Sequence, residues 1–230
     1  MNLPKGIVTA SHQKGGVGKS TIIWELILLY SKHQEVNVID LDVQKTITYS
    51  LENREKSYTK IKNINLLNVR DEKDQIDDNL MFDLMLKNEK EEKLLFIDCG
   101  GFDSSSNRLA MAASNILITP VSSKFYELLG LKKYESILQE LTKDFRDDRK
   151  LVANVILNKI NPNAKDLEQI TSFINSSGYF NLMNTVLRQR VDYENAPGFG
   201  QSVIEYNKKG KAAKEILSLK KELDKILTND

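Results

Sequence analysis

The sequence from position 14 onward reads Lys14-Gly15-Gly16-Val17-Gly18-Lys19-Ser20-Thr21. A short apolar run, residues 6–11, comes before this stretch, and a helical pattern begins at Thr21. The order strand, glycine loop and helix presents backbone N–H groups and a helix N-terminus to the same point, which favours a phosphate chain as ligand. The ordinary phosphate-loop pattern has a glycine where Gln13 stands. The stretch therefore predicts an α/β fold built around a phosphate-binding loop of a variant kind.

The length of 230 residues and the hydrophobic content of 40% predict one α/β domain, residues 1–230, with a substantial core. The net charge of +1 neither indicates nor excludes a nucleic-acid binder, since a local basic patch can exist in a neutral chain. Cys99 is the single cysteine, which excludes an internal disulfide framework and favours a cytoplasmic location. The chain begins without an apolar signal region, and no apolar run approaches the ~20 residues that span a bilayer.

Apolar runs alternate with helical patterns along the whole chain. The predicted strands are residues 6–11, 36–42, 64–69, 93–98, 116–119, 151–158 and 183–187. The predicted helices are residues 21–32, 46–56, 75–88, 107–113, 125–145, 164–175 and 212–227. Pro120 is expected to end the fifth strand, and Trp24, Phe82 and Phe96 are expected in the core. This alternation predicts a mainly parallel, twisted sheet with helices on both faces.

Polar residues stand at four predicted strand ends: the glycine loop, Asp40 with Asp42, Asp98 and Asn158. Ligands of open parallel sheets bind at the carboxyl ends of the strands, so these residues are expected at one site. Asp98 closes a buried strand, where a carboxylate is costly without a cation or ordered waters. It is therefore the best candidate to hold the water shell of a Mg²⁺ ion.

The loop itself supplies the expected phosphate contacts. Lys19 is placed to meet the β- and γ-phosphates as a point charge, and a cation at a helix N-terminus is unfavourable unless an anion lies there. Ser20 offers its hydroxyl to Mg²⁺, and Thr21 offers a further hydroxyl to the phosphates. Asp40 and Asp42 lie two residues apart, so one face of a strand would carry both charges and need a counter-charge. The predicted nucleotide-binding stretch is Lys14, Gly15, Gly16, Val17, Gly18, Lys19, Ser20 and Thr21.

The spelling Lys-Gly-Gly-x-x-Lys-Ser resembles the loop of the ParA/MinD-type ATPases. Residues 38–44, 96–104 and 157–159 resemble further sequence blocks of that family, although Val43 stands where the family usually has proline. The resemblance covers most of the chain. It implies a P-loop NTPase fold of the deviant Walker A type, ATPase activity, and ATP and Mg²⁺ as cofactors.

The resemblance also implies roles for single residues. It implies that Asp42 orients the attacking water, that Asp40 belongs to the metal shell or is structural, and that Lys19 and Lys14 act in catalysis. Lys14 would reach the partner's nucleotide in an ATP-dependent homodimer. Asn158 matches the asparagine that reads adenine, and from the sequence alone a helix or turn cap is an equal alternative.

Only thirteen residues precede Lys14, too few for a helix-turn-helix domain, so the chain most resembles the small ParA partition ATPases of plasmids and chromosomes. That resemblance implies non-specific DNA binding by the ATP dimer, association with the nucleoid, and ATP hydrolysis stimulated by a centromere-binding ParB-like partner. The candidate DNA-binding residues, each with an ordinary solvated side chain as its alternative, are Arg188, Arg190, Lys208, Lys209, Lys211 and Lys214.

Three other functions stay open from the sequence. A ParA-like ATPase could position another cargo, such as conjugation machinery or a protein cluster. A MinD-like regulator would bind membranes through its last helix, but residues 212–227 have a polar face of mixed charge and no Trp or Phe, which favours packing against the sheet. A metabolic enzyme with the same loop would need a substrate constellation that the sequence does not show.

Overall fold

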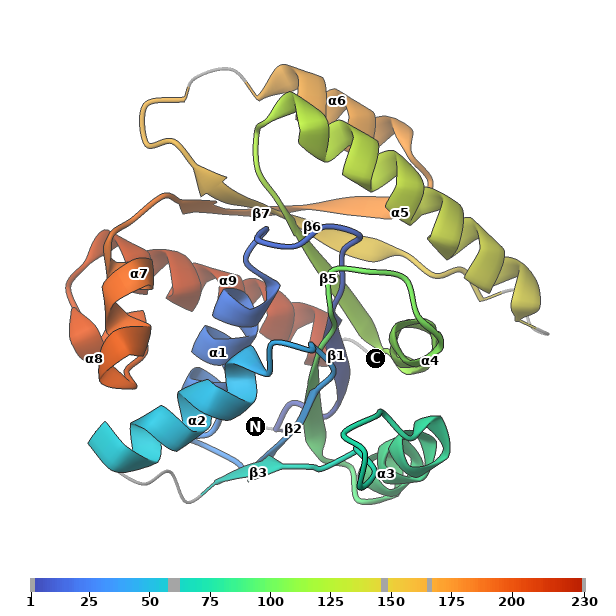
Figure 1. The fold of residues 1–230 in the computed structure, drawn as a ribbon. Coiled ribbons are helices and arrows are strands. Elements are labelled where there is room, and N and C mark those ends of the chain that lie inside the picture. The colour runs from blue at the N-terminus through green and yellow to red at the C-terminus, as the bar shows by residue number, and fades with distance from the viewer. Residues whose placement is uncertain (1–2, 58–62, 146–148, 165–166, 229–230) are drawn as a thin grey trace.

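The computed structural model describes residues 3–57, 63–145, 149–164 and 167–228. Within these residues seven parallel strands form one sheet in the order β3-β2-β4-β1-β5-β6-β7 (Figure 1). The strands are β1 (Gly6–Ala10), β2 (Val36–Asp40), β3 (Ile64–Leu66), β4 (Leu94–Asp98), β5 (Ile116–Val121), β6 (Ala153–Ile160) and β7 (Phe180–Arg188). The helices are α1 (Lys19–Tyr30), α2 (Thr46–Ser57), α3 (Asp78–Lys90), α4 (Ser105–Ala113), α5 (Phe125–Asp144), α6 (Glu168–Ser176), α7 (Asp192–Asn195), the short 3₁₀ helix η1 (Ala196–Phe199), α8 (Val203–Tyr206) and α9 (Lys211–Thr228).

The strand order changes direction at β1. This strand lies between β4 and β5, so the chain builds one half of the sheet with β2 to β4 and the other half with β5 to β7. Open α/β sheets bind ligands at such a switch point, outside the carboxyl ends of the strands. The glycine loop follows β1 directly and therefore stands at this point.

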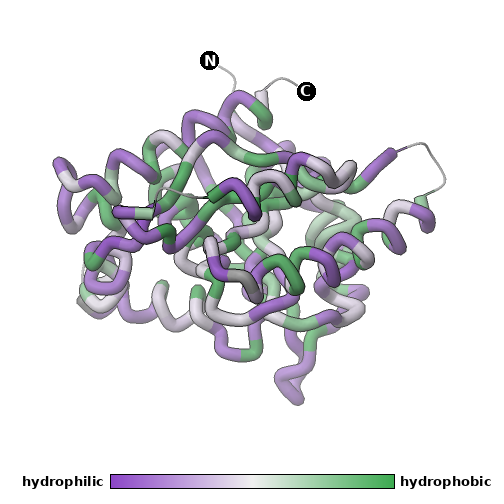
Figure 2. Tube along the Cα trace, turned by 90° about the horizontal axis from the view of Figure 1, so that it is seen from above, coloured by the Kyte–Doolittle hydropathy of each residue, from purple (hydrophilic) through white to green (hydrophobic). Residues whose placement is uncertain are grey.

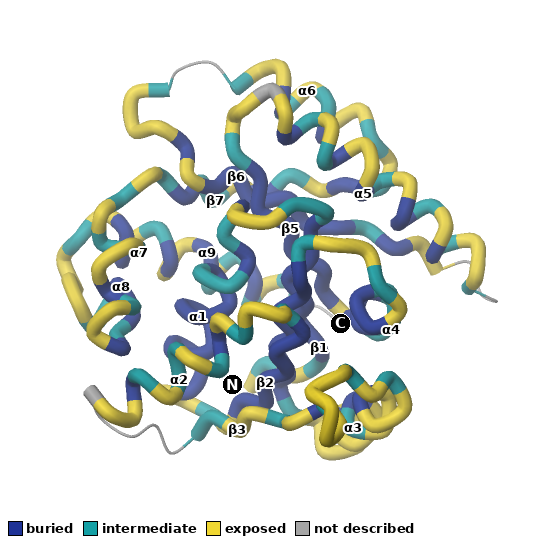
Figure 3. Tube along the Cα trace, viewed as in Figure 1, coloured by how far each residue is buried: buried dark blue, intermediate teal, exposed yellow. Residues whose placement is uncertain are grey.

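Helices cover both faces of the sheet, as the sequence predicts (Figure 1). Helices α1 and α9 pack on one face, with Trp24, Leu26 and Ile216 in the same cluster as Phe96. On the other face, α3 and α4 cover β1, β2 and β4, while α5 and α6 cover β5 to β7. The central strands β1, β2, β4, β5 and β6 are almost entirely buried, whereas the edge strands β3 and β7 are partly exposed and much of the surface of α3 is exposed (Figure 3).

The hydropathy of the chain follows these layers: apolar segments gather in the interior, and polar ones dominate the outer loops and helix surfaces (Figure 2). Trp24 and Phe96 are buried as predicted. Helix α9 lays its apolar stripe on the β7 half of the sheet and buries Ile216, Leu219 and Leu223, which confirms the predicted packing. Its Glu222 also accepts hydrogen bonds from the backbone N–H groups of Asn184 and Thr185 in the edge strand β7.

Several predictions about local structure are wrong: besides the strands predicted for residues 36–42 and 64–69, which end at Asp40 and Leu66, three differ for a clear physical reason. Strand β5 continues through Pro120 to Val121, because beyond Ile118 it pairs only with β6 and a residue without an N–H group is tolerated there. Helix α3 begins at Asp78 rather than at residue 75, since the Asp77 carboxylate caps it. Phe82 is 44% exposed and lines a surface cavity instead of the core. The predicted helix 164–175 includes residues 165 and 166, which lie outside the described residues.

Candidate functional site

The loop between β1 and α1 has the backbone of a phosphate cradle. Gly16 (φ 76°) and Gly18 (φ 99°) lie in the left-handed region that side chains rarely allow. Gly18 is also the N-cap of α1, and neither a capping side chain nor an acidic residue in the first turn satisfies this helix end. The first N–H groups of α1 are thus left open to an anion.

Neighbouring strand ends enclose the loop. A β-carbon added at Gly101, just after β4, would lie 2.7 Å from the Gly15 nitrogen. One added at Gly18 would lie 2.3 Å from the Asn158 amide nitrogen at the end of β6. The approach at Gly101 requires glycine, because the neighbouring atoms are backbone and cannot move aside, while Gly18 requires glycine through its left-handed backbone. The ends of β4 and β6 therefore hold the loop from two directions.

We call the residues Lys19, Ser20 and Asp98 the inner side of the loop. The Lys19 side chain is buried, and its Nζ donates a 3.3 Å hydrogen bond to the Lys14 carbonyl. Burial lowers the pKa of Lys19, and the Asp98 carboxylate opposes that change. A buried ammonium with one long hydrogen bond has room for a further anionic partner.

Asp98 is the residue that best fits a metal shell. It is fully buried, and neither carboxylate oxygen accepts a well-aligned hydrogen bond from the described part of the chain. Burial raises the pKa of Asp98, while the nearby Ser20 hydroxyl and Lys19 lower it. Mg²⁺ prefers oxygen ligands and keeps several waters, so a carboxylate without partners beside a hydroxyl suits it. The described residues contain no group of three or more His, Cys, Asp or Glu side chains that could hold a metal without such waters or phosphates.

Asp40 lies opposite Asp98 in the parallel register of β2 and β4, but its carboxylate already has partners. Its Oδ2 accepts hydrogen bonds from the Thr48 backbone N–H (2.9 Å) and hydroxyl (3.0 Å) at the start of α2. Its Oδ1 accepts one from the Asp42 N–H (3.2 Å). Burial raises the pKa of Asp40, and these hydrogen bonds lower it. These contacts make Asp40 the anchor of the segment that carries Asp42.

Asp42 does not share a strand face with Asp40, because β2 ends at Asp40. It lies in the following turn, half-buried, and its Oδ1 accepts a hydrogen bond from the Gln44 N–H (2.9 Å). Arg70 donates to the Asp42 carbonyl (3.1 Å) and so ties this turn to the segment before α3. Asp42 interacts electrostatically with both Lys19 and Asp98, which places it beside the inner side of the loop.

The outer side of the loop, which we define as Lys14, Glu127, Asn158 and Lys159, is held by ordinary protein contacts. Lys14 Nζ forms a 2.7 Å ion pair with the buried Glu127 carboxylate of α5. Asn158 Nδ2 donates to the Val17 carbonyl (2.7 Å), and Lys159 Nζ donates to the Gly16 carbonyl (2.8 Å). Sequence reasoning missed Glu127 and Lys159. Glu127 follows Lys14 by 113 positions, so no local pattern joins them; Lys159 is signalled only by its place beside Asn158.

His12 lies directly before the loop and is fully buried. Its ring stacks on Tyr134 of α5 at a centroid distance of 6.0 Å. Burial, with Lys19 and Lys14 as weaker causes, lowers the pKa of His12 to about 3. The imidazole is therefore neutral and serves as packing between the loop and α5.

The basic residues proposed for DNA binding fall into two groups. Arg190 is paired with Glu215 at 2.8 Å, and Arg188 donates to the Asn161 carbonyl at 3.0 Å, so both guanidinium groups already have partners within the protein. Lys208, Lys209, Lys211 and Lys214 are exposed around the start of α9. Phe199 and Tyr206 are exposed in the preceding segment and stack on each other at 5.9 Å.

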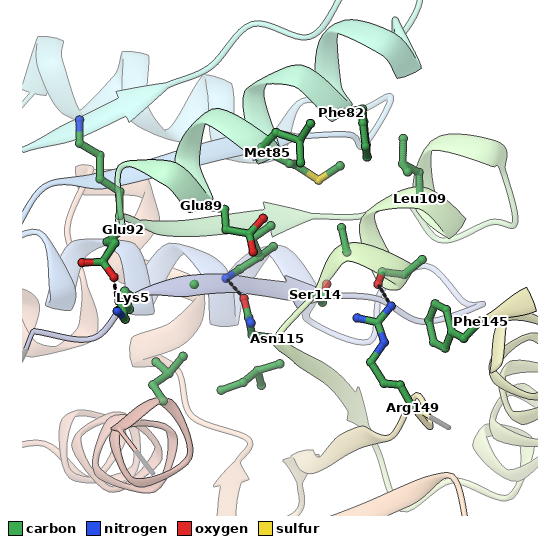
Figure 4. Close-up of a pocket in the computed structure, with 18 residues that line it drawn as sticks. Lys5, Phe82, Met85, Glu89, Glu92, Leu109, Ser114, Asn115, Phe145 and Arg149 are labelled. Atoms are coloured by element: carbon green, nitrogen blue, oxygen red, sulfur yellow. Dashed lines mark hydrogen bonds and ion pairs between the residues drawn. The ribbon is translucent and has the colours of Figure 1, made fainter. Parts of the chain in front are cut away.

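A cavity of 640 Å³ lies at the end of the sheet opposite the loop, at the amino ends of β1 and β5 (Figure 4). Phe82 and Met85 of α3, Leu109 and Phe145 form apolar walls, and Arg149 lies over the Phe145 ring. Lys5 pairs with Glu92 at its rim. This cavity is separate from the loop, which stands at the carboxyl ends of the same strands.

Comparison with known proteins agrees with this geometry. Residues 8–203 match the family described as the CobQ/CobB/MinD/ParA nucleotide binding domain. The chromosome partitioning protein ParA of Myxococcus xanthus (strain DK1622) is 24% identical over 251 residues, covering 95% of this chain and 88% of that protein. A putative plasmid partition protein from Borrelia burgdorferi B31, solved with AMPPNP, has a TM-score of 0.67 at 20% identity and covers 94% of this chain and 99% of its own. An ATP complex of McdA from Cyanothece has a TM-score of 0.72 at 17% identity, covering 97% and 98%. In the described residues no helix has the length and apolarity needed to cross a membrane.

Proposed function

The chain belongs to the CobQ/CobB/MinD/ParA nucleotide-binding family, and we propose that it is a Mg²⁺-dependent ATPase that partitions DNA, with a plasmid as the first candidate cargo. One observation carries the ATPase part of this proposal. The buried Lys19 ammonium and the Asp98 carboxylate, which accepts no well-aligned hydrogen bond from the described residues, interact electrostatically at the open N-terminus of α1. A phosphate chain with a bound cation would satisfy all three groups at once.

The residues have distinct tasks in this proposal. Lys19 and the N–H groups at the start of α1 bind the phosphates, and Ser20 and Asp98 hold the shell of the Mg²⁺ ion, which when bound neutralises charge on the phosphate oxygens. Asp42 orients the attacking water from its turn beside the loop. Asp40 keeps that turn in place through its hydrogen bonds to Thr48 and to the Asp42 N–H. The close approach of Gly101 and Asn158 to the loop limits the freedom of the loop that binds the phosphates.

The partition part of the proposal rests on the relatives. The Myxococcus and Borrelia proteins bear partition names, and the Myxococcus protein matches this chain over 95% of its length. We infer an ATP-dependent homodimer in which Lys14 leaves Glu127 to reach the partner's nucleotide. The dimer would bind DNA without sequence preference through Lys208, Lys209, Lys211 and Lys214, and a centromere-binding ParB-like protein would stimulate hydrolysis.

The water-orienting role is tested with Asp42→Ala. We expect this variant to keep ATP binding and dimerisation but to lose nearly all hydrolysis. Asp83→Ala, which removes an exposed carboxylate on α3, away from the loop, is the matched control. Hydrolysis at the parent rate by Asp42→Ala would reject the assignment.

The cargo is tested by binding to duplex DNA and to anionic liposomes with ATP, ADP or no nucleotide at several salt concentrations. We expect ATP-dependent, salt-sensitive DNA binding that Lys208→Glu/Lys209→Glu weakens. Lys73→Glu/Lys90→Glu makes the same charge change near α3, on the opposite side of the molecule from α8 in Figure 1. Liposome binding that is lost when α9 is deleted would instead support a membrane-associated regulator.

A further inference from the structure

The carboxyl end of β6 contacts two consecutive carbonyl groups of the glycine loop. Asn158 Nδ2 donates to the Val17 carbonyl at 2.7 Å, and Lys159 Nζ donates to the Gly16 carbonyl at 2.8 Å. Asn158 is buried, whereas Lys159 is exposed at the rim of a cavity of 330 Å³ that also borders Lys14 and Lys124. Two adjacent residues of one strand thus hydrogen-bond to two adjacent residues of the loop, and we call this pair of hydrogen bonds the grip.

The backbone of β6 is distorted at the point where this grip forms. Lys159 has a φ of 54°, in the left-handed region that residues other than glycine rarely occupy. The register between β6 and β7 also shifts between Leu157 and Ile160. Successive side chains of a regular strand point to opposite faces, so a regular β6 would direct only one of the two residues toward the loop. A strained backbone that persists at such a place indicates a functional constraint.

The grip fixes the direction of the loop's N–H groups. In a planar trans peptide the carbonyl and the N–H point in opposite directions. The Gly16 carbonyl shares its peptide with the Val17 N–H, and the Val17 carbonyl shares its peptide with the Gly18 N–H. Holding both carbonyls from β6 therefore turns both N–H groups away from β6. Neither N–H donates a hydrogen bond to any group in the described part of the chain.

We propose that Lys159 is a positioning residue that, with Asn158, presets the glycine loop for phosphate before the nucleotide arrives. This inference deepens the proposed function and rests on it for the identity of the ligand. Lys159 acts through the Gly16 carbonyl, so its effect is the same for any nucleotide whose β-phosphate occupies the loop. The Asn158 amide nitrogen donates the other hydrogen bond of the grip, to the Val17 carbonyl. Asn158 therefore has a role besides the predicted recognition of adenine.

Two variants of Lys159 separate positioning from simple charge. Lys159→Met keeps the aliphatic stem and removes the donor, while Lys159→Arg keeps a donor of similar reach. We expect Lys159→Met to weaken ADP and ATP binding equally, by about tenfold, the effect of one hydrogen bond to a charged group. Lys159→Arg should restore most of that affinity. The weakening should persist at high salt, because the bond to Gly16 is a short contact within the protein.

Backbone ¹⁵N relaxation of Gly16, Val17 and Gly18 in the nucleotide-free protein provides a readout that does not depend on activity. The order parameters of these amides should fall in Lys159→Met and stay unchanged in Lys159→Arg. Lys124→Met is the matched control, since Lys124 borders the same cavity and makes no hydrogen bond to the loop. The proposal is wrong if the loop order parameters are unchanged in Lys159→Met, if Lys124→Met has the same effect, or if only ATP binding weakens. Failure of the parent protein to bind any nucleotide would overturn the proposed function, while the relaxation measurement would still decide whether β6 rigidifies the loop.

Discussion

The inner and outer sides of the loop differ in how their polar groups are satisfied. On the inner side Asp98 has no aligned hydrogen-bond donor, Lys19 has one long hydrogen bond, and the start of α1 has no cap. On the outer side each of the four side chains has a partner at 2.7 to 2.8 Å, Lys14 with Glu127, Asn158 with Val17 and Lys159 with Gly16, although the second carboxylate oxygen of Glu127 is unpaired in the described residues.

This difference separates groups that await a ligand from groups that shape the site. Buried polar atoms are nearly always hydrogen-bonded in folded proteins, so an unpaired set on one side calls for a missing partner. The register pair Asp40 and Asp98 makes the same point within two neighbouring strands. Both carboxylates are buried at strand ends, yet Thr48 satisfies Asp40 and no described residue satisfies Asp98.

Removal of Lys19 is expected to have the largest effect. Lys19→Ala deletes the buried cation of the inner side, and we expect ATP binding to weaken at least ~100-fold, which corresponds to about 3 kcal/mol for hydrogen bonds to a charged group. A fluorescent ATP analogue measures the dissociation constant. Lys124→Ala, which removes an exposed lysine near the outer side, should leave it nearly unchanged. Equal effects of the two substitutions would show that the inner side is not the phosphate site.

Neutralising Asp98 tests the metal half of the inner side. Mg²⁺ is expected to raise the affinity for ATP, and Asp98→Asn should make that increase ~10–100-fold smaller. This is the range found when groups that support metal ligands are lost. Binding measured in EDTA should be unchanged. Without ligands we expect only a small change in stability, because the cost of burying the Asp98 charge is removed while its attraction to the buried Lys19 is lost. Asp40→Asn is the contrast: it should lower stability, since the Asp40 oxygens hold the start of α2. The reverse pattern would exchange the roles of the two residues.

The inner side could be predicted from the sequence, because its members follow one another locally or end predicted strands. The loop, Ser20 and Asp98 are recognisable from a glycine pattern and from a buried run that ends in a carboxylate. The alternation of strands and helices likewise predicted the parallel sheet and the burial of Trp24. These features depend on residues that lie near one another in the chain.

The outer side depends on contacts between distant segments. Glu127 reaches Lys14 only because the fold brings the first turn of α5 beside the loop, and the contact of Lys159 depends on a left-handed backbone that no side-chain pattern specifies. The error at Phe82 has the same origin, since helical periodicity places it on an apolar face without telling whether another element covers that face. The sequence does not predict that β5 continues through Pro120, because that depends on where β1 stops pairing with β5.

A buried carboxylate outside the site tests whether burial alone explains why Asp98 lacks an aligned hydrogen-bond donor. Glu25 of α1 is fully buried, but its oxygens accept hydrogen bonds from the Val203 N–H at 3.0 and 3.1 Å. Burial raises the pKa of Glu25 to about 8. Between about pH 4.5 and about pH 8 the unfolded chain therefore binds fewer protons at this residue than the folded one, and the stability of the fold falls as pH rises.

Glu25→Gln should remove that slope, which we expect to amount to about 2 kcal/mol over the interval after allowance for relaxation of the buried site. Denaturant unfolding at several pH values measures it, with the parent protein beside the variant. The glutamine still offers an oxygen to Val203, so the fold should be kept. Mg²⁺ and ATP should leave the slope unchanged, because Glu25 has a protein partner. Identical slopes for parent and variant would mean that Glu25 is ionised in the folded state.

The smallest effect is expected on the outer side, at the pair of Lys14 and Glu127. The Lys14 side chain is 42% exposed, and pairs that exposed contribute about 0–1 kcal/mol to stability. Glu127→Gln should therefore change the free energy of unfolding by less than about 1 kcal/mol. If Lys14 leaves this pair to reach a partner's nucleotide, Glu127→Gln makes the release of Lys14 from α5 easier. ATP-dependent dimerisation, measured by sedimentation, should then strengthen by about twofold to fivefold, the equivalent of breaking one such pair.

Glu140→Gln provides the matched control for that prediction, because Glu140 lies on the same helix and pairs with Arg108 instead of the loop. Stronger dimerisation of Glu127→Gln but not of Glu140→Gln would mean that Glu127 binds Lys14 in the monomer and releases it on dimerisation. Unchanged or weaker dimerisation of Glu127→Gln would mean that Lys14 stays with α5 in the dimer. The outer side would then be a purely structural support for the loop, and the contrast with the inner side would become sharper.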